Sequence, residues 1–180
     1  MFKFDQIAIR TSNINRSIDS LTLQGHTNWV RDTVFASHLF VRGGLNLGFN
    51  FEVHLAFNYE IFEGQEFELI QLVNGKTIQL ADGRRDILSH FGYHIQDQDA
   101  KFPDDHDTLV RELHHLRDRG LEVLQVSQTE THQNTGRRYR YAFAYHPEVG
   151  APIKIIQRLL PVKDNAASVA QGKEMFKWLQ

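Results

Sequence analysis

The chain contains no cysteine among its 180 residues. This absence excludes disulfide bonds, thiolate zinc sites and a cysteine nucleophile. No stretch reaches the roughly 18 apolar residues that a membrane-spanning helix needs. The N-terminal residues also lack the pattern of a secretory signal peptide, in which a basic region precedes an apolar one. We therefore expect a cytoplasmic protein with no membrane partner.

Neither sign of charge dominates the composition. The 20 lysine and arginine residues are balanced by 22 aspartate and glutamate residues, and 41% of the chain is apolar. This balance is typical of a globular protein and lacks the basic surplus of nucleic-acid-binding proteins. The length suits one compact domain. We therefore expect a single globular unit with no nucleic-acid partner.

Histidine is abundant instead, with ten residues in the chain. Where cysteine is absent, a bound transition metal would need histidine and carboxylate ligands. The composition therefore suggests a metal site, and the positions of the histidines decide whether one can form.

The order of expected elements occurs twice along the chain. Alternating and helical apolar patterns predict one strand, one helix and three further strands within residues 1–73. The same order follows in 87–160, after a polar, glycine-containing connection at 74–86. Residues 161–180 predict a C-terminal helix. We interpret residues 1–73 and 87–160 as two modules of a single compact domain.

The spacing of matching residues supports this duplication. Gln6 and Glu68 are 62 residues apart, and His90 and Lys154 are 64 apart. The stretches around them share an apolar frame, and the matching pairs are 5–10 with 89–94 and 67–71 with 153–157. Self-similarity at a fixed spacing indicates a repeated supersecondary unit.

Taken together, four stretches resemble the vicinal oxygen chelate superfamily. Its members include glyoxalase I, methylmalonyl-CoA epimerase, extradiol dioxygenases such as dihydroxybiphenyl dioxygenase, and fosfomycin and bleomycin resistance proteins. The resemblance implies an α+β fold in which paired βαβββ modules form a U-shaped mixed sheet around a cavity for a small molecule. It leaves open whether the chain forms a homodimer. The four stretches are 4–10, 66–71, 89–94 and 150–157.

The resemblance also implies a set of metal ligands. Carried over by position, it comprises Gln6, Glu68, His90 and Lys154. The first three offer oxygen and nitrogen donors that suit zinc, nickel, iron or manganese. Lys154 departs from the pattern, because superfamily enzymes usually have a carboxylate there and an ammonium group has no acceptor.

Two interpretations of Lys154 remain open. If Lys154 turns away, Gln6, Glu68 and His90 keep a metal with open positions for a substrate oxygen. The protein would then be a metal-dependent lyase, isomerase or epimerase, with Glu68 as ligand and catalytic base at an enolate. If the ammonium instead replaces the metal and pairs with Glu68, the protein binds a small molecule without chemistry, as resistance proteins do. We favour the second interpretation over the first and over a solvated sheet edge.

Other candidates for contact with a ligand come from strand alternation. His94 lies four residues after His90 and shares its strand face, although a structural role is the alternative. His54 is a further candidate, since either face of its strand could line the cavity, and Lys154 is another. The adjacent His114 and His115 fit a solvated helix face. The remaining histidines lie near turns or strand ends and receive no role: His26, His38, His106, His132 and His146.

The most basic stretch of the chain predicts two opposite strand faces. Arg138 and Arg140 share one face, and Tyr139, Tyr141 and Phe143 share the other. If the arginine face lines the cavity mouth, it would bind an anionic substrate. A solvated arginine face is the alternative, in which case the aromatic face could stack on a planar ligand.

Overall fold

The computed structural model describes residues 2–43, 46–77, 88–95, 106–145 and 152–180. The first half of the chain forms β1 (Phe2–Arg10), α1 (Ile14–Thr22), β2 (Val30–Val41), β3 (Asn50–Phe62) and β4 (Gln65–Asn74). The second half forms β5 (Leu88–Ile95), α2 (His106–Asp118), β6 (Glu122–Thr129), β7 (Arg138–Tyr145), β8 (Ile153–Leu159), α3 (Asn165–Met175) and the short 3-10 helix η2 (Lys177–Leu179).

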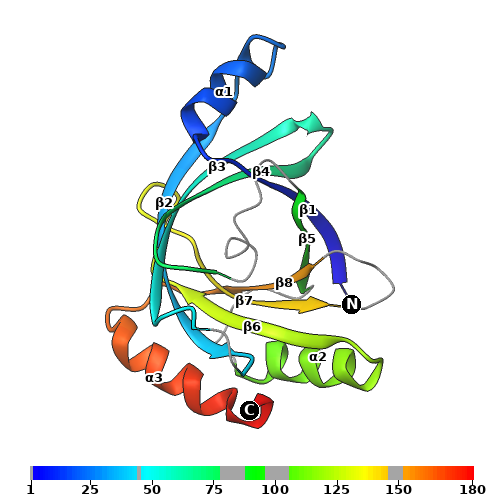
Figure 1. The fold of residues 1–180 in the computed structure, drawn as a ribbon, viewed down its shortest axis with the longest axis vertical. Helices are drawn as coiled ribbons and strands as arrows, with labels where there is room; N and C mark the ends of the chain where they lie inside the picture. Colours follow the sequence, from blue (N-terminus) through cyan, green and yellow to red (C-terminus); the bar gives the residue numbers. More distant parts are fainter. Residues whose placement is uncertain (1, 44–45, 78–87, 96–105, 146–151) are drawn as a thin grey trace.

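The strands form one closed barrel in the order β1-β4-β3-β2-β6-β7-β8-β5 (Figure 1). The pairs β1/β4 and β5/β8 are parallel and the other pairs are antiparallel. This confirms the predicted α+β fold with a mixed sheet, and it is consistent with paired βαβββ modules. The sheet curves beyond a U shape, because β1 pairs with β5 and β2 pairs with β6.

Alternation along the strands divides the apolar residues between the inside and the outside of the barrel. On β3, Phe51, Val53, Leu55 and Phe57 all point inward. Ala56 belongs instead to a cluster with residues of α1 and β4 on the outer face. A strand that is covered on both faces is apolar on both, and this fold has several such strands.

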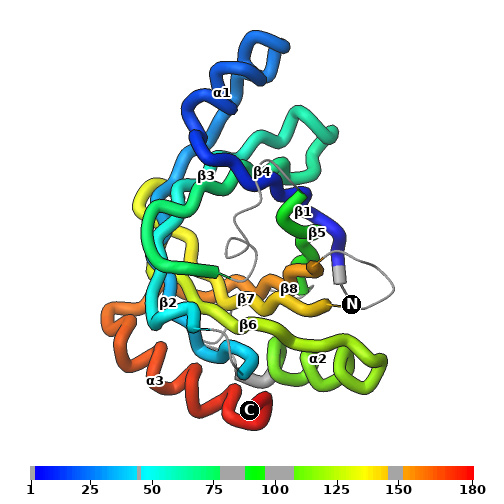
Figure 2. The backbone as a smooth tube through the Cα atoms, in the orientation of Figure 1, coloured from blue at the N-terminus to red at the C-terminus, as the bar shows by residue number. Residues whose placement is uncertain are grey.

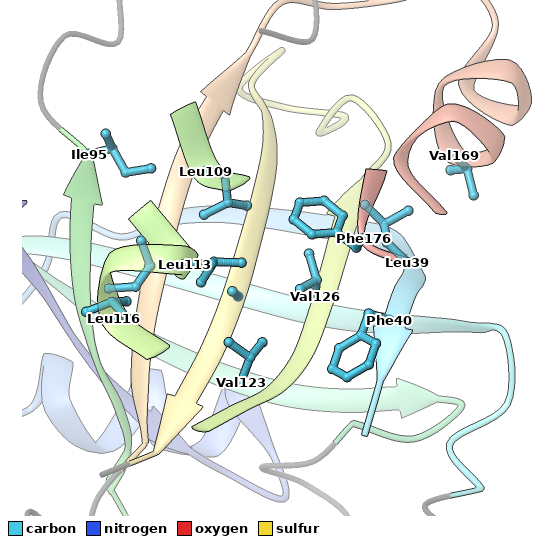
Figure 3. Packing of buried hydrophobic residues seen from close by; sticks show 12 residues of the cluster. Leu39, Phe40, Ile95, Leu109, Leu113, Leu116, Val123, Val126, Val169 and Phe176 are labelled. Atoms are coloured by element: carbon cyan, nitrogen blue, oxygen red, sulfur yellow. The ribbon is translucent and has the colours of Figure 1, made fainter. Parts of the chain in front are cut away.

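The helices lie on the outer surface of the barrel. α2 packs against β6 and β8, and α3 packs against β2 (Figures 1 and 2). The predicted helical positions Leu109, Leu113 and Leu116 are buried in the cluster drawn in Figure 3, where Phe176 from the C-terminal end also packs. No helix in the described parts of the chain is long and apolar enough to cross a membrane.

Candidate functional site

The barrel contains a cavity of about 780 Å³, counting its open mouth. Aliphatic and aromatic side chains form much of the wall, and polar groups gather on part of it. The apolar residues are Val34, Phe51, Val53, Leu55, Phe57, Ile70, Phe143 and Ile156, with the rings of Tyr139 and Tyr141.

The four residues of the implied ligand set meet on the cavity wall. His90 Nε2 lies 2.9 Å from Gln6 Oε1 and 3.5 Å from Glu68 Oε2. Lys154 Nζ donates to Gln6 Oε1 at 3.3 Å and lies 3.7 Å from Glu68 Oε2. Although they come from β1, β4, β5 and β8, their side chains are within contact distance because these four strands are neighbours around the barrel.

A glycine allows Gln6 to take this position. Gly92 faces Gln6 across the β1/β5 pair. A Cβ atom at Gly92 would lie 2.7 Å from both Cβ and Oε1 of Gln6. Only a residue without a side chain therefore permits the close approach that places the amide among the other polar groups.

Glu66 is a cavity residue that the sequence reasoning missed. Gln6 Nε2 donates a short hydrogen bond to Glu66 Oε1, and Tyr59 OH donates to Glu66 Oε2 at 2.7 Å. The signal was available, because Glu66 lies two residues before Glu68 on the same strand and must share its face. The cavity therefore holds two neighbouring carboxyl groups.

Burial governs the protonation of the polar wall. It raises the pKa of both glutamates, and their proximity raises the pKa of Glu66 further, while the Lys154 ammonium opposes the rise at Glu68. Burial, together with Lys154, holds the pKa of His90 well below its usual range. His90 is therefore a neutral imidazole at neutral pH. Gln6 Oε1 is an acceptor, so the network assigns the imidazole proton to Nε2.

Gln6, Glu68 and His90 are the residues that could hold a divalent metal ion. The three donors of Gln6, Glu68 and His90 lie close enough to share an ion, since zinc binds such ligands at ~2.0–2.2 Å. The Lys154 ammonium, however, occupies the same place and contacts the same oxygens. Among the residues described, no group of three or more histidine, aspartate and glutamate side chains is arranged to hold a metal. As they are arranged, these residues fit an ammonium group and do not fit an additional divalent cation.

His94 also lines the cavity, as expected of a residue on the His90 face. Its Nε2 lies 3.6 Å from Asp5 Oδ2, and its ring packs edge-on against Tyr139. Its side chain is 24% exposed. It therefore lies near the solvent side of the polar wall.

The expected placement of His54 is corrected by the structure. His54 alternates with inward-pointing Val53 and Leu55 on β3 and is absent from the described cavity lining. Sequence alternation places His54 on the opposite face from these neighbours, but only the curvature of the sheet decides which face is inside.

The expected placement of Arg138 and Arg140 at the cavity mouth is also corrected. Both are fully buried on the outer face. Arg138 donates to Ser168 Oγ of α3 at 2.5 Å, and Arg140 donates to Gln128 Oε1 at 2.6 and 3.0 Å. The alternative, an aromatic face toward the ligand space, is the arrangement observed. The arginines are not solvated either, because α3 covers this face.

Among known proteins, solved structures resemble this chain, and the likeness is one of fold. No family model and no curated protein matches the chain. A hypothetical protein of Bacillus halodurans C-125 is similar in structure with a TM-score of 0.53 and 11% identity, over 91% of this chain and 99% of that one.

Two other solved structures give lower scores. The first is a 4-hydroxymandelate synthase variant from Streptomyces coelicolor, with a TM-score of 0.49 and 13% identity, over 98% of this chain and 54% of that one. The second is a methylmalonyl-CoA epimerase from Streptomyces coelicolor, with a TM-score of 0.44 and 12% identity, over 87% of this chain and 94% of that one. At this low identity, the likeness to the Bacillus halodurans protein concerns the fold alone.

Proposed function

We propose that this chain binds a small organic molecule in the barrel cavity without a resident metal, as a glyoxalase-like or bleomycin-resistance-like binding protein. The observation that carries the proposal is the position of Lys154 Nζ, 3.3 Å from Gln6 Oε1 and 3.7 Å from Glu68 Oε2. The ammonium supplies a positive charge to a fully buried carboxyl group and occupies the space that an ion would need.

The walls of the cavity support binding of an organic ligand. Aromatic and aliphatic side chains would bury a ring or a short chain, while the polar groups would orient it. The ligand contacts we propose on the polar side are His94 and Lys154, both of which line the cavity. His54, Arg138 and Arg140 would need a rearrangement to contribute.

Metal analysis of the purified protein tests the proposal. We expect less than stoichiometric zinc, nickel, iron or manganese in the wild type, and no thermal stabilisation when these ions are added. Lys154→Glu restores a carboxylate and removes the ammonium, so this variant should gain metal-dependent stabilisation. Lys163→Glu makes the same charge change at an exposed site and should gain none.

A metal-dependent lyase, isomerase or epimerase is the second candidate. It is favoured by the convergence of Gln6 Oε1, His90 Nε2 and Glu68 Oε2, provided that Lys154 leaves. Glu68 would then be the catalytic residue. Stoichiometric metal in the wild type that disappears in a Gln6→Ala, His90→Ala double variant would overturn the metal-free proposal and support this one.

As part of this proposal, we expect the protein to act in the cytoplasm. Homodimers are common in the superfamily that this chain resembles. Sedimentation of the purified chain would measure its oligomeric state directly. The proposed ligand site lies within the barrel of one chain. We therefore expect binding to need no second copy.

A further inference from the structure

His132 is a cavity residue for which the sequence predicted no role. It lies in the turn between β6 and β7, lines the cavity, and has a side chain only 4% exposed. Its backbone is fixed, since its N–H donates to Arg137 O at 2.7 Å and its carbonyl accepts from Gly136 N at 3.0 Å. Gly136 has φ of 64°, which favours glycine. The turn therefore holds the imidazole in one place.

The Asp32 carboxylate lies beside the imidazole. Its Oδ2 lies 3.6 Å from His132 Nδ1, and the Asp32 side chain is fully buried. The carboxylate accepts four hydrogen bonds, from the backbone N–H groups of Thr33, Asn134 and Thr135 and from Thr135 Oγ1, at 2.9–3.2 Å. Such donors suit an anion. A carboxylate beside Nδ1 favours a proton on that nitrogen and leaves Nε2 as an acceptor.

The other ring nitrogen, Nε2, is available to a ligand. Within the described parts of the chain, His132 Nε2 is buried and has no hydrogen-bond partner. Native proteins rarely leave such an atom unpaired, because burying it without a partner costs free energy. Another atom of a cavity residue, Thr77 Oγ1, is in the same condition. A ligand is the group that can satisfy them.

Burial favours the neutral imidazole of His132. Burial lowers the pKa of His132 to about 4, which Asp32 and Glu68 oppose and Lys154 and Arg137 reinforce. The Tyr139 ring packs against the imidazole edge-on at 5.2 Å. At neutral pH the imidazole is therefore uncharged, so that a proton on Nδ1, beside Asp32, leaves Nε2 as the acceptor.

We propose that His132 Nε2 accepts a hydrogen bond from a hydroxyl group of the cavity ligand, and that the ligand is a phenol-like compound. This inference rests on the proposed binding function. The aromatic wall of Phe51, Phe57 and Phe143 suits a ring. A neutral donor fits better than a cationic one, because Lys154 and Arg137 already line the same cavity.

Matched probes test the inference. Phenol and anisole differ in that anisole carries no donor. We expect the wild type to bind phenol about five- to tenfold more tightly than anisole in calorimetric titration, the effect of one hydrogen bond. His132→Leu should lose the preference, and His54→Leu, which removes an outward imidazole, should keep it.

A second measurement keeps the test independent of the variants. In the wild type, phenol should shift the ¹⁵N resonance of His132 Nε2, and anisole should not. Equal affinity for the two probes, a preference that survives in His132→Leu, or an unchanged Nε2 resonance would overturn the role of His132. Failure of both probes to bind would overturn the phenol class. The metal-free proposal is judged separately, by metal content and by Lys154→Glu.

Discussion

Replacing Lys154 with methionine removes the ammonium group and keeps most of the side-chain volume. The two charges of the Lys154–Glu68 pair lie 3.7 Å apart, and the side chains are 12% and 2% exposed. A pair at this separation is worth about 4 kcal/mol at an effective dielectric constant of ~20. Because removing one partner leaves a buried charge uncompensated, we expect a loss of about 3–4 kcal/mol in the free energy of unfolding at neutral pH.

Protonation of Glu68 limits this loss and makes it depend on pH. Protonating a carboxyl group with an ordinary pKa of about 4.3 costs about 4 kcal/mol at about pH 7.5 and only about 1 kcal/mol at about pH 5. Burial raises the pKa of Glu68 in the folded protein, so the ionised group destabilises the fold above its ordinary pKa and ceases to do so as the pH falls. Removing Lys154 raises that pKa further. The deficit of the variant should therefore shrink on acidification.

Urea unfolding of the wild type and Lys154→Met at these two pH values measures the effect. Lys163→Met at an exposed position is the control for the change in net charge. Adding Glu68→Gln to Lys154→Met removes the orphaned charge and should recover much of the loss. A deficit that is equal at both pH values, or no larger than that of Lys163→Met, would refute the pairing of Lys154 with Glu68.

Two further substitutions test the surroundings of the site. Gly92→Ala would place a Cβ atom 2.7 Å from Gln6, so we expect a loss of about 1–3 kcal/mol in urea unfolding, whereas Gly43→Ala meets nothing within 4 Å and should change little. Arg140→Met leaves the buried Gln128 oxygen without two donated hydrogen bonds, at a cost of about 1–3 kcal/mol, while phenol affinity stays unchanged. A changed affinity would contradict the position of Arg140 outside the cavity.

The four residues of the polar wall were expected from the resemblance, which implied them by their positions in the sequence. Gln6, Glu68, His90 and Lys154 occupy equivalent places in two repeated modules, and neighbouring strands bring equivalent places together. The sequence also contained the signal for Glu66, in the two-residue period that it shares with Glu68. Local periodicity was sufficient for Glu66, once Glu68 was placed on the wall.

The positions of Arg138 and Arg140 needed information that periodicity does not contain. A period of two tells which residues share a face, and it does not tell which face is inside when both are covered. On β7 the aromatic face lines the cavity and the arginine face lies under α3. His132 was beyond reach for another reason, since its partner Asp32 is 100 residues away along the chain.

Lys154 determines more than the charge of the site, because its hydrogen bond orients the groups next to it. The ammonium donates to Gln6 Oε1, which directs Gln6 Nε2 toward Glu66 and requires the proton of His90 on Nε2. Gln6 Nε2 and His90 Nε2 thereby donate to acceptors of the protein. An acceptor that stays unsatisfied is then available to a ligand, and His132 Nε2 is such an atom, in a turn whose backbone is fixed and beside the buried Asp32 carboxylate.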